Sequence, residues 1–200
     1  ICQQKNYGLF RCKGGWLIIK VAVVINGKAG SGKDTFCNLC GDYAKVKIIS
    51  TVDKVKEAYA LLGWDGEKSE KHRKALSDIK DISTKALDHP FNYIKQNIDY
   101  FFSPISDDEI LFIHSREPEE IKRLVDCFGC KTLFIRNDSV PDITSNHADA
   151  NVEKYKNYDY IINNNGDFKQ LDAQAKNFVE NLRKEVQEWD IEKNSKVRKS

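Results

Sequence analysis

The sequence predicts an α/β fold of three layers, in which helices cover both faces of a mainly parallel sheet of five strands. Three observations lead to this prediction. Short apolar runs alternate with segments of helical periodicity along most of the chain. The run Val21 to Ile25 reads as a buried strand and leads directly into a glycine-rich loop. The chain has 200 residues, of which 40% are hydrophobic, and this suits one domain with a sizeable core.

The glycine-rich loop reads Gly27-Lys28-Ala29-Gly30-Ser31-Gly32-Lys33-Asp34-Thr35. It contains Gly-x-x-x-x-Gly-Lys, the pattern of a phosphate-binding loop (P-loop), whose backbone N–H groups converge on phosphate oxygens. Lys33 is expected to add a positive charge at the β- and γ-phosphates. The alternative is a chance glycine-rich turn, but the order of strand, loop and helix argues against it. The loop therefore predicts a nucleoside triphosphate site in a P-loop NTPase fold.

The residues after the loop lysine depart from the usual pattern. Ser or Thr normally follows the lysine and holds Mg²⁺, whereas this chain has Asp34 and then Thr35. The form Gly-Lys-x-x-Ser-Gly-Lys-Asp-Thr resembles the loop of phage and bacterial deoxynucleoside monophosphate kinases, and more distantly that of adenylate kinases. This resemblance implies that Thr35 supports the phosphates and that Asp34 lies near the water shell of the metal.

The spacing of hydrophobic residues predicts the remaining strands and helices, and proline and glycine mark where some of the helices begin and end. Strands after Val21–Ile25 are expected at residues 46–49, 110–113, 132–135 and 158–162. Helices are expected at residues 34–43, 51–62, 69–87, 90–102, 118–128 and 171–189. In the second of these helices, Val52, Val55, Tyr59 and Leu62 share one face.

The chain divides into an N-terminal extension at residues 1–15, for which no function is assigned, and a P-loop domain at residues 16–200. Within this domain, the helices of residues 51–104 are expected to bind the acceptor. The polar segment 136–152 is expected to act as a lid over the site. The chain begins with Ile and contains no Met, which suggests a fragment or a processed start.

Cationic and aromatic residues gather in the segment after the second strand. Asp53-Lys-Val-Lys56, Leu62-Gly-Trp64-Asp-Gly-Glu-Lys68 and Arg73 resemble the acceptor-binding region of the deoxynucleoside monophosphate kinase group. Asp53, Lys56, Trp64, Lys68 and Arg73 are therefore the expected substrate-binding residues. Lys56, Lys68 and Arg73 suit the charge of a monophosphate, and Trp64 suits an aromatic wall. The alternative for the charged residues is a solvated helix face.

The end of the strand at 110–113 is the second place where chemistry is expected, because ligands bind at the carboxyl ends of parallel strands. Arg116 is the candidate to hold the acceptor or transferring phosphate, and either Glu117 or Asp34 is the candidate to organise Mg²⁺. Related kinases often have an acidic residue at the position of His114, for which we expect a structural role. The alternative for Glu117 to Glu120 is an acidic helix start.

Two further predictions concern the donor nucleotide. Arg136, at the start of the expected lid, is assigned a catalytic role alongside Lys33 and Arg116, with a surface arginine as the alternative. The run Tyr158-Asp-Tyr-Ile-Ile-Asn163-Asn-Asn165-Gly resembles the last strand and turn of guanylate and dephospho-coenzyme A kinases. That resemblance implies that Asn163 and Asn165 lie by the base of the donor.

Composition excludes several classes of function. The 32 basic and 30 acidic residues nearly cancel, so nucleic acid is not expected as a partner. No apolar run reaches the roughly 20 residues that cross a bilayer, so a cytoplasmic protein without a membrane contact is expected. The pairs Cys37/Cys40 and Cys127/Cys130 match Cys-x-x-Cys, but buried free thiols are favoured over zinc or disulfides. The run Ile135-Arg-Asn-Asp138 lacks the guanine-reading pattern of GTPases.

These observations predict a kinase that uses ATP and Mg²⁺ to phosphorylate a (deoxy)nucleoside monophosphate. The sequence does not indicate an oligomeric state. The first alternative is a kinase for another phosphorylated metabolite, of the dephospho-coenzyme A or phosphomevalonate type. The second is a nucleotide-binding regulatory protein without transfer activity, which Asp34 and His114 would suit.

Overall fold

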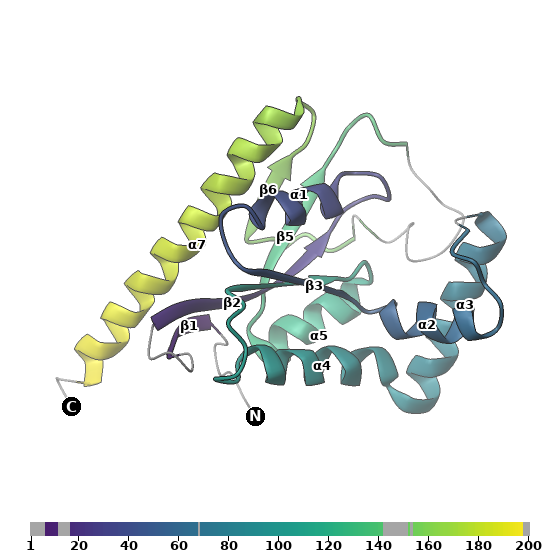
Figure 1. Cartoon of the computed structure of the whole chain (residues 1–200), viewed down its shortest axis with the longest axis horizontal. Coiled ribbons are helices and arrows are strands. Elements are labelled where there is room, and N and C mark those ends of the chain that lie inside the picture. The colour runs from purple at the N-terminus through teal and green to yellow at the C-terminus, as the bar shows by residue number, and fades with distance from the viewer. Residues whose placement is uncertain (1–6, 12–16, 68, 142–151, 153, 198–200) are drawn as a thin grey trace.

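A computed structural model of the chain describes residues 7–11, 17–67, 69–141, 152 and 154–197. Its strands are β1 (Tyr7–Arg11), β2 (Leu17–Asn26), β3 (Val46–Ser50), β4 (Ile110–His114), β5 (Lys131–Arg136) and β6 (Tyr160–Asn163). Its helices are α1 (Lys33–Cys40), α2 (Asp53–Leu61), α3 (Glu70–Leu87), α4 (His89–Phe101), α5 (Pro118–Phe128) and α7 (Phe168–Val197). Helices lie on both faces of the sheet, so the predicted three-layer α/β fold is confirmed (Figure 1).

The sheet is built around β2, which lies in the middle of the strand order β3-β4-β2-β5-β6. β2 runs parallel to β4 and β5, and β3 and β6 add parallel pairs at the two edges. In this register Val23 is paired with Phe112 on one side and with Lys131 on the other. The parallel core of the prediction is therefore confirmed, including the position of the P-loop strand at its centre.

The predicted number of strands is wrong by one. β1 pairs antiparallel with the first half of β2, with Tyr7 opposite Val21 and Arg11 opposite Leu17. This strand falls in the segment 1–15, where the sequence shows no clear periodicity. β2 begins at Leu17, four residues before the buried run Val21–Ile25, and this first part of the strand provides the backbone groups with which β1 pairs.

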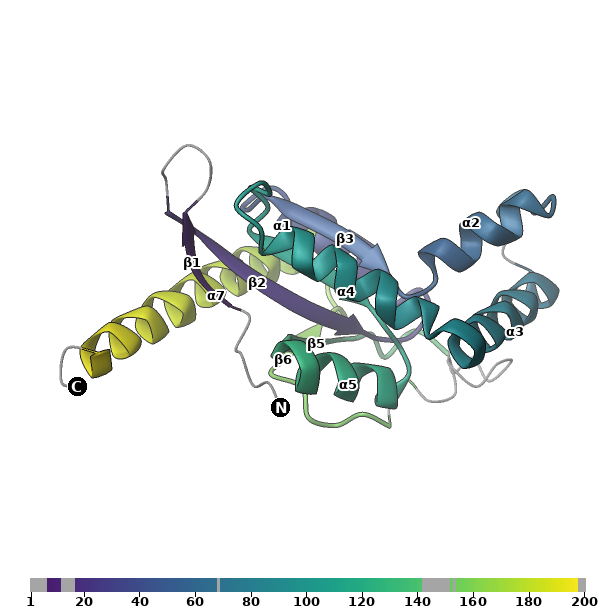
Figure 2. The same ribbon diagram turned by 90° about the horizontal axis from the view of Figure 1, so that it is seen from below.

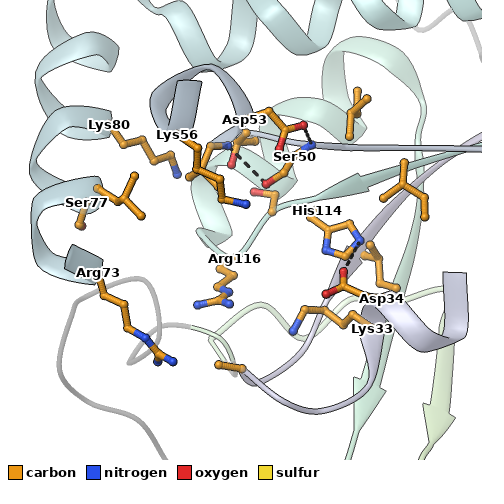
Figure 3. Close-up of a pocket in the computed structure, with 18 of the residues that line it drawn as sticks. Lys33, Asp34, Ser50, Asp53, Lys56, Arg73, Ser77, Lys80, His114 and Arg116 are labelled. Atoms are coloured by element: carbon orange, nitrogen blue, oxygen red, sulfur yellow. Dashed lines mark hydrogen bonds and ion pairs between the residues drawn. The ribbon is translucent and has the colours of Figure 1, made fainter. Parts of the chain in front are cut away.

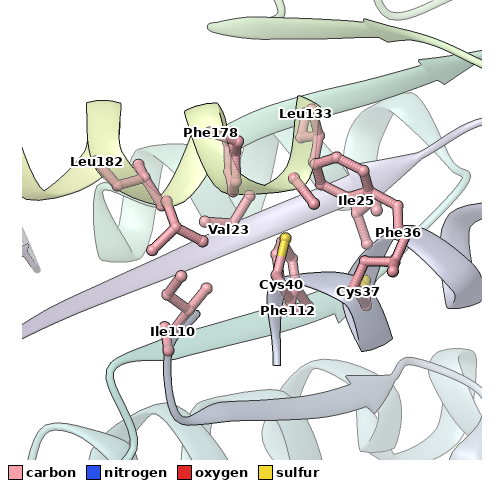
Figure 4. Packing of buried hydrophobic residues seen from close by; sticks show 14 of the residues in the cluster. Val23, Ile25, Phe36, Cys37, Cys40, Ile110, Phe112, Leu133, Phe178 and Leu182 are labelled. Atoms are coloured by element: carbon pink, nitrogen blue, oxygen red, sulfur yellow. The ribbon is translucent and has the colours of Figure 1, made fainter. Parts of the chain in front are cut away.

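Two apolar cores lie on the two faces of the sheet. On one face, α1 and α7 cover alternate residues of β2, and Phe36 of α1 packs edge-on against Phe178 of α7 with ring centroids 5.6 Å apart (Figure 4). On the other face, α4 and α5 cover Ala22 and Val24. Val21 to Ile25 are at most 1% exposed because both faces of the strand are covered. The P-loop therefore starts from a strand that is buried on both sides.

Helices α2 and α3 form an arm beyond the carboxyl ends of the strands, which Figure 2 shows from the side. Val55 is the buried residue of α2 and Lys80 that of α3. Leu62, which the helical spacing places on the same face as Val55, follows the last residue of α2 and is 78% exposed. The arm is thus attached to the domain with little hydrophobic burial.

A buried lysine ties the sheet to the end of α4. Lys20 of β2 is 1% exposed, and its Nζ donates hydrogen bonds to the carbonyl oxygens of Phe101, Ser103 and Ser106. Carbonyl oxygens at the end of a helix have no intrahelical partner and carry partial negative charge, so an ammonium group suits this place. The contact holds the return from α4 to β4 against the central strand.

Several predictions concern residues outside the described ranges. Lys68 and most of the expected lid, residues 142–151, are among them. Among the described cysteines, Cys37, Cys40 and Cys130 are buried free thiols, as favoured above, whereas Cys127 is exposed. Burial raises the pKa of Cys40 and of Cys130 to about 12. In the part of the chain that the structure describes, no helix is long and apolar enough to cross a membrane.

Candidate active site

The site lies where the connections from two neighbouring strands leave the sheet on opposite faces. β2 leads to α1 on one face, and β4 leads to α5 on the other. Such a divergence opens a crevice at the carboxyl ends of the strands, the common ligand site of open α/β sheets. The P-loop follows β2, while His114 ends β4 and Arg116 follows it. The arm lies across the crevice from them (Figure 3).

Two glycines are required by the shape of the P-loop. Gly27 has φ 148°, and a Cβ there would lie 2.5 Å from the carbonyl oxygen of Ile135. Gly32 has φ 93°, and a Cβ there would lie 2.3 Å from Nδ2 of Asn164. Both positions combine a left-handed backbone with a close neighbour, so a side chain would strain the loop and displace that neighbour. The loop is packed against β5 at Gly27 and against the turn after β6 at Gly32.

The start of α1 has the properties of an anion site. Gly32 is the N-cap residue and makes no side-chain cap, so the N–H groups of the first turn point out of the helix without a capping side chain. Lys33 Nζ donates to the carbonyl oxygens of Gly27, at 2.5 Å, and of Lys28, at 2.7 Å, which holds the ammonium group over the loop. Ser31 Oγ is buried and has no hydrogen-bond partner among the described residues. This arrangement fits the phosphates of a nucleoside triphosphate.

His114 is partly buried and lines the wall of the pocket. Its Nε2 lies 3.7 Å from Oδ1 of Asp34 and 3.8 Å from Sγ of Cys37. Burial lowers the pKa of His114 to about 4, and the carboxylate of Asp34 only partly opposes that effect. The imidazole is therefore neutral at physiological pH and available as a hydrogen-bonding group beside the P-loop.

A pocket of about 640 Å³ connects the P-loop with the arm. The P-loop side contributes residues Ala29 to Thr35 other than Ser31, while Lys56, Trp64 and Arg73 come from the arm and Arg116 follows β4. Asp53 also lines the pocket and accepts a hydrogen bond from Ser50 N at 2.7 Å. The structure thus brings together predicted donor and acceptor residues from four separate segments. Gly27, Lys28 and Ser31 support the loop without lining the pocket.

An aromatic group holds Trp64 in the pocket wall. Its ring stacks on Tyr59 with centroids 5.4 Å apart and an interplanar angle of 18°, and its Nε1 donates to the carbonyl oxygen of Glu67. Tyr59 Oη lies 2.8 Å from Nδ1 of His72, whose Nε2 is 3.3 Å from Glu67. Trp64 is therefore held on one face and at its polar edge, which preorganises a wall for a planar ligand.

A polar chain links α3, α5 and the end of β4. Lys80 Nζ of α3 lies 2.6 Å from Oε1 of Glu120, in the first turn of α5. The other carboxylate oxygen, Oε2, accepts a hydrogen bond from Ser115 Oγ at 2.9 Å. Ser115 is buried and directly precedes Arg116, while Lys80 also lines the pocket. None of these three residues was predicted from the sequence. The one signal was the acidic first turn of α5, which is equally typical of helix capping.

Beyond the P-loop, three further predicted residues lie outside the pocket lining. Arg136 ends β5 and is exposed. Asn163 is bonded through its backbone to Gln174, and Asn165 bonds to Asp138. The residue between them, Asn164, makes the contact with the P-loop through a 2.9 Å hydrogen bond from Nδ2 to the carbonyl oxygen of Ser31. The turn after β6 therefore meets the phosphate loop through a different asparagine from the two predicted.

Asp34 and Glu117 both line the pocket, and Asp34 is 90% exposed. The described residues contain no group of three or more His, Cys, Asp or Glu side chains that could hold a metal ion by themselves. Mg²⁺ commonly binds through one or two carboxylates together with substrate phosphates and water. These two carboxylates line the same pocket as the P-loop and fit such a shared site, in which Mg²⁺ would neutralise phosphate charge.

Comparison with known proteins finds similarity in structure but not in sequence. No protein-family model and no curated protein matches the chain. TT1252 from Thermus thermophilus aligns with a TM-score of 0.50 at 13% identity, over 82% of this chain and 98% of that one. A shikimate kinase from Bacteroides thetaiotaomicron aligns with a TM-score of 0.45 at 14% identity, over 82% and 98%. A sugar kinase from Janibacter sp. HTCC2649 gives 0.45 at 13%, over 80% and 95%. At these identities the similarity to TT1252 supports the fold alone.

Proposed function

We propose that this protein transfers the γ-phosphoryl group of ATP to a (deoxy)nucleoside monophosphate. One observation carries the proposal: a single pocket joins the P-loop to Lys56, Arg73 and Arg116, which approach the same space from three segments (Figure 3). A phosphate monoester has about two negative charges at neutral pH and suits such a cluster of cations. A protein that only binds or hydrolyses a nucleotide has no need for a second anion site beside the first.

The reaction needs positioning and charge stabilisation rather than a covalent intermediate. An oxygen of the acceptor phosphate forms a bond to the γ-phosphorus while the bond from that phosphorus to the β,γ-bridging oxygen breaks, and ADP leaves with the electron pair. The acceptor oxygen is already anionic, so no side chain has to remove a proton from it. Lys33 and the N–H groups at the start of α1 would hold the donor phosphates. Arg116 lies between Lys33 and Arg73 in the pocket, where it could contact both anions (Figure 3).

The side chains of the arm suit an acceptor with a planar base. Trp64 presents an aromatic wall in the same pocket as Arg73, so one ligand could place its phosphate by the cations and its base by the ring. The expected roles of Arg136, Asn163, Asn165 and Lys68 remain predictions, as does closure of a lid at residues 136–152.

A coupled assay of ADP release with Mg-ATP tests the proposal against a panel of acceptors. The panel contains ribo- and deoxynucleoside monophosphates, dephospho-coenzyme A and phosphomevalonate, with Lys33→Ala as the inactive control. We expect release that depends on one or more monophosphates. If ADP were released only with dephospho-coenzyme A or only with phosphomevalonate, that metabolite would be the acceptor in place of a nucleoside monophosphate. If ATP bound but no acceptor stimulated ADP release, the protein would be a regulatory one.

A further inference from the structure

The two carboxylate oxygens of Glu120 contact residues from two different parts of the pocket. Oε1 pairs with Lys80 of the arm, and Oε2 accepts the hydrogen bond from Ser115 at the end of β4. We propose that Glu120 is a positioning residue that sets the place of the acceptor cations Arg73 and Arg116 without touching the acceptor. This inference rests on the proposed function, because it assigns these arginines to the acceptor phosphate.

The arm depends on this contact more than on apolar packing. Lys80 is the only buried residue of α3, a helix that the structure describes in full. Its ammonium group is 2.6 Å from the carboxylate, and its side chain is 11% exposed while that of Glu120 is 24% exposed. An ion pair this sheltered from solvent is screened little, and the loss of one partner leaves a poorly hydrated charge behind. The pair is therefore a strong determinant of where α3 lies.

Arg73 lies on the same face of α3 as Lys80. The two are seven residues apart, which is close to two turns of helix and places them roughly 10 Å apart along the axis. Ser77 and Leu76, between them in sequence, line the pocket with them. A tilt or rotation of α3 that follows the loss of the Lys80 contact would thus displace the guanidinium group of Arg73.

The second oxygen acts on the other side of the pocket. Ser115 is 2% exposed, and its N–H donates a hydrogen bond to the carbonyl oxygen of Ile25, the penultimate residue of β2. Its hydroxyl is held by Glu120, so both the backbone and the side chain of Ser115 are fixed. Arg116 follows directly, and its backbone position is set by this pair of contacts.

The test uses Glu120→Gln, which keeps the size of the side chain and removes its charge, with Glu119→Gln as the matched control. Glu119 is the exposed neighbour in the same helical turn and does not line the pocket. We expect Glu120→Gln to raise KM for the acceptor by about tenfold and KM for ATP by less than about twofold, since the lost contacts are hydrogen bonds to a charged group. Lys80→Met should reproduce the part of the effect that acts through Arg73.

Hydrogen–deuterium exchange of α3 and of residues 114–117 provides a readout that does not need an active enzyme. We expect faster exchange in both segments for Glu120→Gln and unchanged exchange for Glu119→Gln. Equal exchange in the two variants, or equal acceptor KM, would contradict the positioning role. If no acceptor in the panel is phosphorylated by the parent protein, the proposed function fails, and the exchange result still decides whether Glu120 orders the pocket.

Discussion

The two ends of the pocket are held in different ways. The P-loop end follows β2, which is buried on both faces, and Gly27 and Gly32 pack directly against β5 and the turn after β6. The arm end has one buried residue in each of α2 and α3, and is held by the Lys80–Glu120 pair and by the aromatic contacts of Trp64. Apolar burial thus fixes the P-loop end, whereas polar contacts leave the arm end easier to change.

The largest effect is expected from Lys33→Ala. This change removes the ammonium group over the P-loop and, with it, the charge that would stabilise the transferring phosphoryl group, so kcat should fall by about 10³-fold. The fold should remain, because the buried strand and both cores are untouched. Steady-state kinetics and circular dichroism of the purified variant check both statements. Retained turnover would show that the P-loop is not the donor site.

Gly32→Ala should come next, and Gly30→Ala is its matched control. Both glycines have positive φ, 93° and 83°, but only at Gly32 would a Cβ meet a neighbour, Nδ2 of Asn164. The new methyl group would displace that side chain from Ser31, so we expect the Kd for ATP to rise about tenfold for Gly32→Ala and clearly less for Gly30→Ala. Titration calorimetry measures both values. Equal losses would mean that backbone strain alone decides the effect.

Arg73→Ala tests the acceptor end. The variant should raise KM for the monophosphate by about tenfold with little change in KM for ATP, because the lost contact is a charge-assisted hydrogen bond. Lys71→Ala, on the exposed side of the same helix, controls for the general loss of positive charge. If both variants raised KM equally, the charges of α3 would form a solvated face rather than a binding site.

A smaller effect concerns pH at the donor end. Asn26 Nδ2 donates to Tyr158 Oη at 2.7 Å, and burial raises the pKa of Tyr158 to about 12. The phenol ionises near pH 10 in the unfolded chain, so its contribution to stability is present below about pH 10 and is lost as the pH rises toward about 12. The loss should be on the order of 1 kcal/mol, since the side chain is partly exposed to solvent.

Urea unfolding at about pH 9 and about pH 11 measures this loss. Tyr158→Phe should remove that part of the alkaline loss, whereas Tyr100→Phe, at an exposed tyrosine, should leave it in place. The same alkaline slope in the parent and in Tyr158→Phe would show that Tyr158 does not contribute to it.

The sequence located the P-loop end of the pocket better than the arm end for a physical reason. A P-loop needs glycines and a lysine at fixed spacing after a buried strand, so local sequence defines its geometry. Lys80, Glu120 and Ser115 are far apart in the chain and meet only through the packing of α3 on α5. The turn after β6 was located correctly, but which of three consecutive asparagines faces the loop depends on the backbone there. β1 was missed because its pairing with β2, not its own pattern, makes it a strand.

The most direct test of the central claim follows the phosphoryl group itself. ATP labelled with ¹⁸O in the γ-phosphate is incubated with the protein, Mg²⁺ and the best monophosphate acceptor, and the products are analysed by mass spectrometry. We expect a nucleoside diphosphate that contains the labelled phosphoryl group, formed by the parent protein and not by Lys33→Ala. Label found only in inorganic phosphate would contradict it, since the pocket would then deliver the phosphoryl group to water.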